Sequence, residues 1–203
     1  MKEHILWLFD SIWPSIVIAS VIVVTLRIWY IIKNKTEFYL YHELIMFSFV
    51  IYIMCLFYVV TFPDDLSNYP NSFNLIPFKE MFRYDLMSRL FIKNVLGNLV
   101  MFMPLGFYSA YIVKVYKLRY ITLFVAIVSI TIEFTQLAIG RVFDIDDILL
   151  NIVGGSSGFY IYYIMHKIKS AFPRFFGKPL VYNTVTVIAI LIFIFFAYRT
   201  INY

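Results

Sequence analysis

The residues most able to do chemistry in this sequence stand around Glu133, a carboxylate inside a long apolar segment. Gln136 follows one turn later on the same helical face, and Arg141 and three aspartates come shortly afterwards. A carboxylate in an apolar segment is costly within a membrane, so it marks a candidate functional site whose partners should lie close by. The polar cluster therefore comprises Glu133, Gln136, Arg141, Asp144, Asp146 and Asp147.

Three interpretations of this cluster are open from the residues alone. A hydrogen-bonded network centred on Arg141 could join two neighbouring helices. A divalent cation could be held by the carboxylates, because hard cations prefer oxygen ligands. The cluster could also be a catalytic or ligand-binding pocket, with Glu133 as acid or base and Arg141 holding a phosphate or carboxylate. The candidate catalytic residues, which are also the candidate cation ligands, are Glu133, Asp144, Asp146 and Asp147.

A nucleophile with a base beside it is not evident. Ser129 lies one turn before Glu133 on the same face and is the one candidate. We expect its hydroxyl to bond the backbone of its own helix instead. The sequence thus leaves open whether the protein is an enzyme.

Composition places these residues in a membrane protein. The chain has 203 residues, of which 62% are hydrophobic, 21% aromatic and only 14% charged. A soluble domain of this size cannot hide so much apolar surface. The net charge of +5 is spread over short basic patches between apolar runs, which fits orientation signals and anionic lipid better than nucleic acid. The single cysteine, Cys55, excludes an intrachain disulfide.

Apolar runs predict an all-α, polytopic bundle of about six transmembrane helices in one membrane domain, residues 1–203. The predicted spans are 12–32, 44–62, 95–113, 120–139, 148–165 and 180–198. The loop at 63–93 carries apolar and charged residues at three- and four-residue spacing, which predicts an amphipathic or re-entrant segment between the second and third spans. This segment is either a lid packed on the bundle or an element that gates a lipid or substrate.

Lysine and arginine are more numerous in the loops on one side once the long loop 63–93 is set aside. The positive-inside tendency therefore predicts that both termini lie outside. Two spans separate the long loop from the acidic loop 140–147, so these loops share one face in either orientation. We expect that face to be the outer one.

The fourth and fifth predicted spans are joined so closely that they must be antiparallel neighbours. On the fifth, Asp147, Asn151, Gly154 and Gly158 form one stripe at steps of four, three and four residues. Glycines at this spacing let another helix approach closely. We expect the stripe to contact the fourth span. On the third span, Asn98 lies one turn after Asn94.

The ordered motifs resemble the VanZ-like family of bacterial membrane proteins, over about residues 50–165. The motifs are Asn74-Leu75-Ile76-Pro77-Phe78, Asn94-x-x-Gly97-Asn98, Phe102-x-Pro104-Leu105-Gly106, Glu133-x-x-Gln136, Gly140-Arg141-x-x-Asp144-x-Asp146-Asp147 and Asn151-x-x-Gly154-x-x-x-Gly158. The family is associated with resistance to teicoplanin and related lipoglycopeptides. The resemblance implies a multi-pass protein of the bacterial plasma membrane that acts at the cell envelope. The candidate ligand-binding residues, all of which stand in these motifs, are Asn74, Asn98, Gln136, Arg141 and Asn151.

The resemblance thus implies a protein that lowers susceptibility to teicoplanin-type antibiotics, and we expect it to act through an outer-face polar cavity. Its expected partner is a membrane lipid, a lipid-linked cell-wall precursor or the drug itself, and not a nucleic acid. The alternative is a membrane-embedded enzyme that modifies an envelope lipid or precursor by carboxylate acid-base or metal chemistry. No cofactor is indicated beyond the possible divalent cation.

Overall fold

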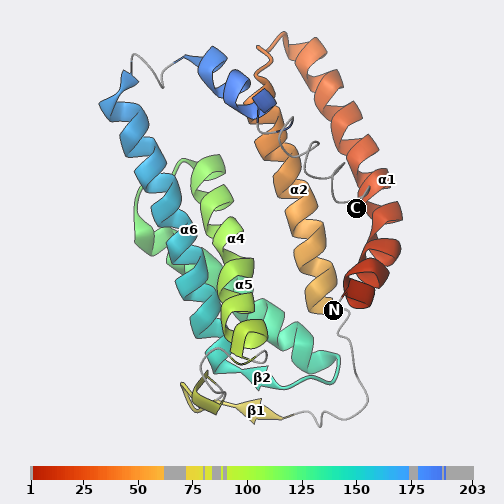
Figure 1. The fold of residues 1–203 in the computed structure, drawn as a ribbon, viewed down its shortest axis with the longest axis vertical. Helices are drawn as coiled ribbons and strands as arrows, with labels where there is room; N and C mark the ends of the chain where they lie inside the picture. The colour runs from red at the N-terminus through yellow and green to blue at the C-terminus, as the bar shows by residue number, and fades with distance from the viewer. Residues whose placement is uncertain are drawn as a thin grey trace. The chain divides into compact units, whose positions relative to one another are not determined.

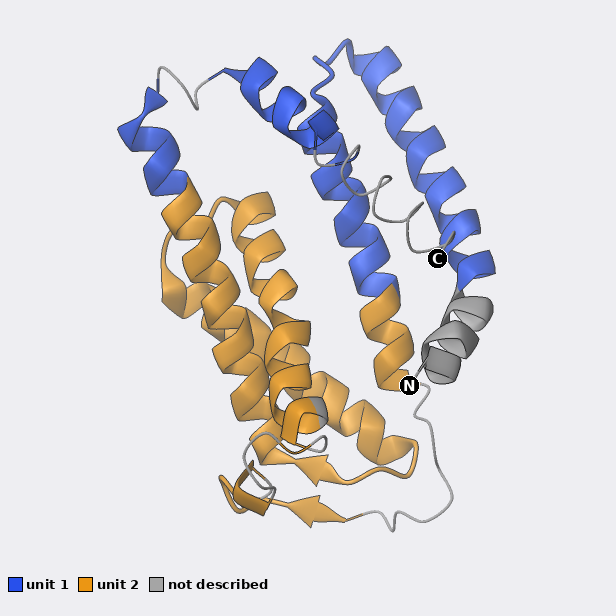
Figure 2. Cartoon of the chain, viewed as in Figure 1, with its two compact units in different colours: residues 1–54, 166–203 blue, residues 55–165 orange. Residues whose placement is uncertain are grey.

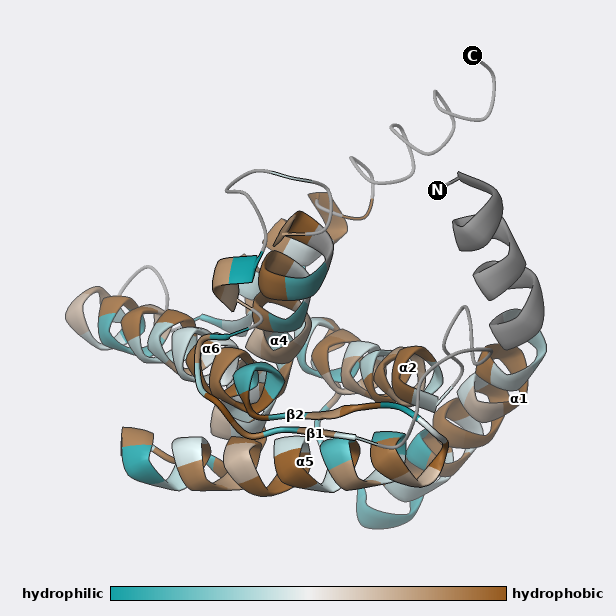
Figure 3. Cartoon of the chain, turned by 90° about the horizontal axis from the view of Figure 1, so that it is seen from below, coloured by the Kyte–Doolittle hydropathy of each residue, from teal (hydrophilic) through white to brown (hydrophobic). Residues whose placement is uncertain are grey.

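The protein is an all-α, multi-pass membrane protein in a computed structural model (Figure 1). The structure describes residues 2–61, 72–79, 81–83, 88, 91–173, 178–188 and 190. Within these residues, five helices are long and apolar enough to cross a membrane. Hydrophobic residues predominate along them (Figure 3). The helices are α1 (Lys2–Asn34), α2 (Leu40–Thr61), α4 (Gly97–Val113), α5 (Leu118–Ala138) and α6 (Ile145–Ala171).

The five helices coincide with the first five predicted spans. A shorter apolar helix, Pro179–Ile188, covers the start of the sixth, whose remaining residues fall largely outside the described ones. Lysine and glycine mark the turns between the later helices. Helix α4 ends where Lys114 takes a left-handed conformation with φ of 55°, and Gly140 turns the chain after α5 with φ of 93°.

The chain divides into two compact units (Figure 2). Unit 1 comprises residues 1–54 and 166–203, and unit 2 comprises residues 55–165. In unit 1, the guanidinium of Arg27 on α1 donates two hydrogen bonds to the Glu43 carboxylate on α2, at 2.7 and 2.8 Å. The Tyr41 ring packs on Tyr182 with ring centroids 5.1 Å apart, and Tyr41 N donates to Asn183 Oδ1. These contacts join α1, α2 and the helix Pro179–Ile188.

Unit 2 is built on close contact between the backbones of α4 and α6. A Cβ added to Gly154 would lie 2.2 Å from the carbonyl oxygen of Leu99, and one added to Gly158 would lie 1.9 Å from that of Met103. Only glycine permits this approach. The predicted partner of these two glycines was wrong, because they face the third span, α4. Asn151 of the same predicted stripe does contact the fourth span, α5.

Helix α5 packs on a different face of α6. Asn151 contacts Ser129, while the Cβ position of Gly155 lies against the Val125 side chain further along both helices. The contacts pair higher residue numbers on α6 with lower residue numbers on α5. The two helices therefore run antiparallel, as predicted. The sequence does not reveal that α6 divides its small residues between two partners.

The long loop of unit 2 contains a strand that the sequence analysis did not predict. Strand β1 (Phe73–Asn74) pairs in parallel with β2 (Phe143–Asp144), and Phe143 N donates to Ser72 O at 3.0 Å. The predicted shared face of the two loops is thereby confirmed. A turn at 76–79 and the short helix η1 (Met81–Arg83) follow β1. The rest of the predicted amphipathic segment, up to 90, lies mostly outside the described residues.

The chain enters α4 through a π-helical turn, η2 (Ile92–Leu96). Such a turn widens the helix by one residue and is frequent at functional sites. Pro104, inside α4, has no N–H and so removes one further helical hydrogen bond. The π-helical turn precedes Asn98 and Pro104 follows it, so an irregularity lies on each side of this residue.

Candidate functional site

Glu133 is almost fully enclosed, with 1% of its surface exposed, and both of its carboxylate oxygens accept hydrogen bonds. Asp144 N donates to Oε2 at 2.9 Å. With the Gln136 amide oriented to match its neighbours, Gln136 Nε2 donates to Glu133 Oε1 at 3.0 Å. A buried carboxylate with both oxygens hydrogen-bonded avoids much of the cost of its burial.

Arg141 joins this arrangement through Gln136. In the same orientation of the amide, Arg141 Nη1 donates to Gln136 Oε1 at 2.7 Å. The turn at Gly140 places Arg141 there, and Arg141 N also donates to the backbone oxygen of Gln136 at 2.9 Å. Arg141 thus connects the loop to the end of α5. Its guanidinium is linked to the Glu133 carboxylate through the Gln136 amide.

Asp144 connects the helices to the strand pair. Its Oδ1 accepts hydrogen bonds from Asn74 Nδ2 at 2.9 Å and from Asp146 N at 2.8 Å. Because Asn74 and Asp144 are register partners in β1 and β2, the side-chain bond reinforces the backbone pairing. Phe143, beside Asp144, packs its ring between those of Phe73 and Phe134, with centroids 5.8 and 5.1 Å apart.

Asp146, at the start of α6, holds the segment that follows β1. It is 1% exposed, and its carboxylate accepts hydrogen bonds from the backbone N–H groups of Phe78 and Met81. Phe78 has a φ of 67°, a left-handed conformation that is costly for a residue with a large side chain. The Asp146 carboxylate stabilises this turn by satisfying two of its N–H groups.

Two further pairs lie deeper along α6. Asn98 Nδ2 on α4 donates to Asp147 Oδ1, and Asn151 Nδ2 donates to Ser129 Oγ on α5 at 2.9 Å. The Ser129 contact between helices was not predicted. Among the described residues, two buried amide oxygens, those of Asn74 and Asn151, have no hydrogen-bond partner.

The structure therefore brings most of the predicted site residues into one chain of hydrogen bonds, which we call the acidic network. Asp147 with Asn98, and Asn151 with Ser129, form separate pairs. The acidic network comprises Asn74, Glu133, Gln136, Arg141, Asp144 and Asp146.

The hydrogen bonds form a network that joins neighbouring elements, but it is not centred on Arg141 as the first interpretation had it. Arg141 lies at one end of the network, and Asp144 makes most of its bonds. Among the described residues, no three carboxylate, imidazole or thiol groups lie close enough together to hold a metal ion. The carboxylates of Glu133 and Asp146 are instead directed at protein N–H groups.

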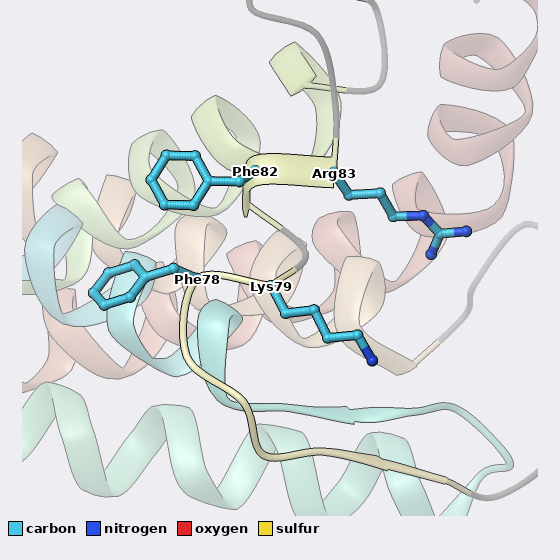
Figure 4. Close-up of a pocket in the computed structure, with 4 residues that line it drawn as sticks. All are labelled: Phe78, Lys79, Phe82 and Arg83. Carbon is cyan, nitrogen blue, oxygen red and sulfur yellow. The ribbon is translucent and has the colours of Figure 1, made fainter.

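A pocket of about 530 Å³ opens beside the turn that Asp146 holds. Phe78, Lys79, Phe82 and Arg83 line it. The two phenyl rings lie on one side of the segment, and the two cationic side chains extend the other way (Figure 4). The ring centroids of Phe78 and Phe82 are 6.3 Å apart. The pocket thus has an apolar side and a cationic side.

The sequence carries a signal for this pocket that the predicted site omits. Both pairs, the phenylalanines and the cations, repeat at a spacing of four residues. The sequence analysis included these four residues in an amphipathic segment. It did not include them among the candidate site residues, which were chosen around the acidic cluster. The acidic network and the pocket segment, residues 72–83, are together called the polar end of unit 2.

Comparison with known proteins places this arrangement in a family. The family model described as VanZ/LLP1 matches residues 49–166, which is more than half of the chain and includes all of unit 2. This chain belongs to the VanZ/LLP1 family. All the motifs that carry the resemblance in this VanZ/LLP1 protein lie within the matched residues 49–166. No curated protein and no solved structure matches it.

Proposed function

We propose that this VanZ/LLP1 protein lowers the susceptibility of a bacterial cell to teicoplanin-type lipoglycopeptides by binding at the polar end of unit 2. The ligand is an envelope lipid, a lipid-linked cell-wall precursor or the acyl-bearing drug. Binding reduces the amount of drug that reaches its target. The protein acts in the plasma membrane, with the polar end on the outer face.

The observation that carries this proposal is the way the acidic network supports an exposed pocket. Asp146 holds the turn of Phe78 and Met81, and the lining residue Phe82 is 83% exposed. Buried, hydrogen-bonded groups beneath exposed ones make a rigid surface for a ligand, because little ordering remains to be done on binding.

The burial of two of the four candidate catalytic residues, Glu133 and Asp146, favours a structural role for these two. A general acid or base must come within hydrogen-bond reach of the reacting atom. Glu133 and Asp146 are each 1% exposed, and their oxygens already accept bonds from the protein. A ligand reaches the pocket-lining residues without displacing any of these bonds.

Expression of the chain in a susceptible bacterium tests the proposal. The minimal inhibitory concentration of teicoplanin should rise several-fold, and that of a glycopeptide without an acyl chain should rise less. A variant with Lys79→Gln and Phe82→Ala, which alters only exposed lining residues, should lose the protection at equal expression. An unchanged inhibitory concentration with the wild-type chain would contradict the proposal.

A further inference from the structure

We propose that strand β1 and the turn after it lie in the bilayer, with Phe73, Leu75 and Ile76 in contact with the acyl chains of the leaflet beside the polar end of unit 2. The partner of this surface is therefore the lipid of the membrane itself. The inference concerns how the protein contacts the bilayer, and so it goes beyond the proposed function.

The side chains of β1 reverse the pattern expected of a strand beside water. Asn74 is 8% exposed and its Nδ2 donates to Asp144 Oδ1, whereas Phe73 and Leu75 on either side of it are 60% and 61% exposed. Successive side chains of a strand point to opposite faces, so β1 turns its amide inward and its large apolar groups outward. A strand beside water keeps its apolar residues inside. Apolar groups outside and polar groups inside are typical of strands that face lipid.

The exposed apolar surface continues past the strand. Ile76 is 62% exposed, and Pro77 and Phe78 after it are exposed as well. Residues 75–78 thus present four consecutive non-polar side chains. A contiguous apolar surface of this kind marks contact with a membrane or with another protein.

Helix α5 favours the membrane as the partner. Apolar residues at helical spacing form an exposed stripe along it, namely Leu123, Ile127, Ile130 and Phe134. Since α5 is long and apolar enough to cross a membrane, this stripe is the side that it presents to lipid. The ring of Phe134 packs on that of Phe143 with centroids 5.1 Å apart, and Phe143 packs on Phe73 at 5.8 Å. The apolar surface of β1 therefore continues the lipid-facing surface of α5.

The backbone of β1 determines how deep the strand lies. Among the described residues, β1 pairs with β2 alone, so its other edge is open. Backbone N–H and C=O groups without a partner are not tolerated in hydrocarbon. We therefore place the strand at the boundary between headgroups and acyl chains, where water reaches its open edge and lipid contacts its side chains.

This placement has a consequence for the pocket. Phe78, at the end of the exposed apolar surface, lines the pocket and packs on Phe82 with ring centroids 6.3 Å apart. The apolar side of the pocket then opens toward the acyl chains. An amphiphile already in that leaflet reaches the pocket without passing through water. This consequence rests on the proposed function, because it concerns the ligand of the same site.

Fluorescence quenching of purified protein tests the inference. The full chain, with Trp7, Trp13 and Trp29 replaced by phenylalanine, receives the single reporter Leu75→Trp and is reconstituted in phosphatidylcholine vesicles. Phosphatidylcholine with bromine near the headgroup end of its acyl chains should quench this tryptophan more than lipid with bromine near the methyl ends. Ile76→Trp, made separately, should give the same result, so the test does not depend on the folding of one variant.

Two control reporters calibrate the quenching. Ile127→Trp, in the middle of the α5 stripe, should be quenched most by bromine near the methyl ends of the chains. Thr36→Trp, in the exposed connection between Lys35 and Glu37, should be quenched by aqueous iodide and little by either brominated lipid.

A face of β1 that is open to water, or is covered by a second copy or by another part of the chain, would contradict the inference. In each case brominated lipid would quench Leu75→Trp and Ile76→Trp no more than Thr36→Trp. The measurement involves no drug. A chain that protects cells without this quenching would overturn the inference alone, and one that is quenched but gives no protection would overturn the proposed function alone.

Discussion

Each unit of the protein contains an arginine associated with a glutamate, and the two associations are built differently. In unit 1, Arg27 binds Glu43 directly, with two hydrogen bonds at 2.7 and 2.8 Å. In unit 2, Arg141 reaches Glu133 only through Gln136. The direct pair joins two helices at one point, and its groups are partly exposed. The indirect one is the start of a chain of bonds that continues through Asp144 to β1 and Asp146.

The difference shows what each polar group stabilises. A direct, bidentate pair satisfies both charges locally and makes no demand on the surrounding backbone. In the acidic network, most acceptors bind backbone N–H groups, so each side chain fixes a stretch of loop. Breaking the first arrangement should affect helix contact alone, whereas breaking the second should release the pocket segment.

Packing follows the same division. In α1 none of the described side chains is buried, as suits a helix in contact with lipid. In α6 the buried residues include three glycines, whose backbones touch α4 and α5. Substitutions that enlarge a side chain should therefore lower the free energy of unfolding more in unit 2 than in α1.

The largest effect is expected for Gly158→Leu. Its Cβ would lie 1.9 Å from the Met103 carbonyl oxygen, so the backbones of α4 and α6 must separate. We expect a loss of about 3 kcal/mol or more in the free energy of unfolding, and little folded protein in detergent. The yield of monodisperse protein on size exclusion measures this. Val153→Leu, at a 52% exposed position of the same helix, is the control and should behave as wild type.

Glu133→Gln should have the next largest effect. The new amide places an N–H group opposite an existing donor, which costs about 1–3 kcal/mol in a buried site. The midpoint of thermal unfolding should fall by about 2–4 °C for each kcal/mol. Drug tolerance should fall with it, because the network loses its bond to Asp144 or to Gln136. Unchanged unfolding together with lost tolerance would instead assign Glu133 a direct chemical role.

Arg141→Lys should have a smaller effect. Among the described residues, the side chain of Arg141 is linked to the network by a bond from Nη1 to Gln136 Oε1. Lysine keeps the charge but lacks the planar guanidinium, so we expect a loss of about 1 kcal/mol, close to one hydrogen bond. Tolerance should be reduced and not abolished. Complete loss of tolerance in a well-folded variant would show that Arg141 contacts the ligand.

Ser129→Ala should have the smallest effect. It removes the acceptor for Asn151 Nδ2 between α5 and α6. Hydrogen bonds between membrane helices average about 0.6 kcal/mol, so the unfolding midpoint should shift by no more than a few degrees. Tolerance should remain at the wild-type level, since this pair is separate from the acidic network. Loss of tolerance at unchanged stability would make the Ser129 hydroxyl part of the site.

The helices were predictable because each is a long apolar run bounded by charged residues or turn-forming glycine. The family could be recognised because its motifs are spread over unit 2 in a fixed order. The acidic residues also signalled their importance, since a carboxylate such as Glu133 is rarely tolerated in an apolar segment without a partner.

The contacts could not be predicted, for identifiable reasons. The glycine stripe of α6 has the same spacing whichever helix it faces, so its contact with α4 depends on the arrangement of three helices. Strand β1 has only two residues, Phe73 and Asn74, too few to show an alternating pattern. Asp146 accepts hydrogen bonds from the backbone N–H groups of Phe78 and Met81. Every residue except proline has such a group, so the residue types at these positions do not predict the contact.

Hydrogen exchange of the segment 72–83 in three forms of the protein tests most directly whether the acidic network holds the pocket. Glu133 reaches this segment through Asp144, whose carboxylate accepts hydrogen bonds from Asn74 Nδ2 and from Asp146 N. Asp146 in turn holds the Phe78 and Met81 amides. Glu133→Gln should therefore speed exchange of the Phe78 and Met81 amides relative to wild type, while Arg27→Gln with Glu43→Gln in unit 1 should leave it unchanged. Equal protection of these two amides in wild type and Glu133→Gln would contradict the account.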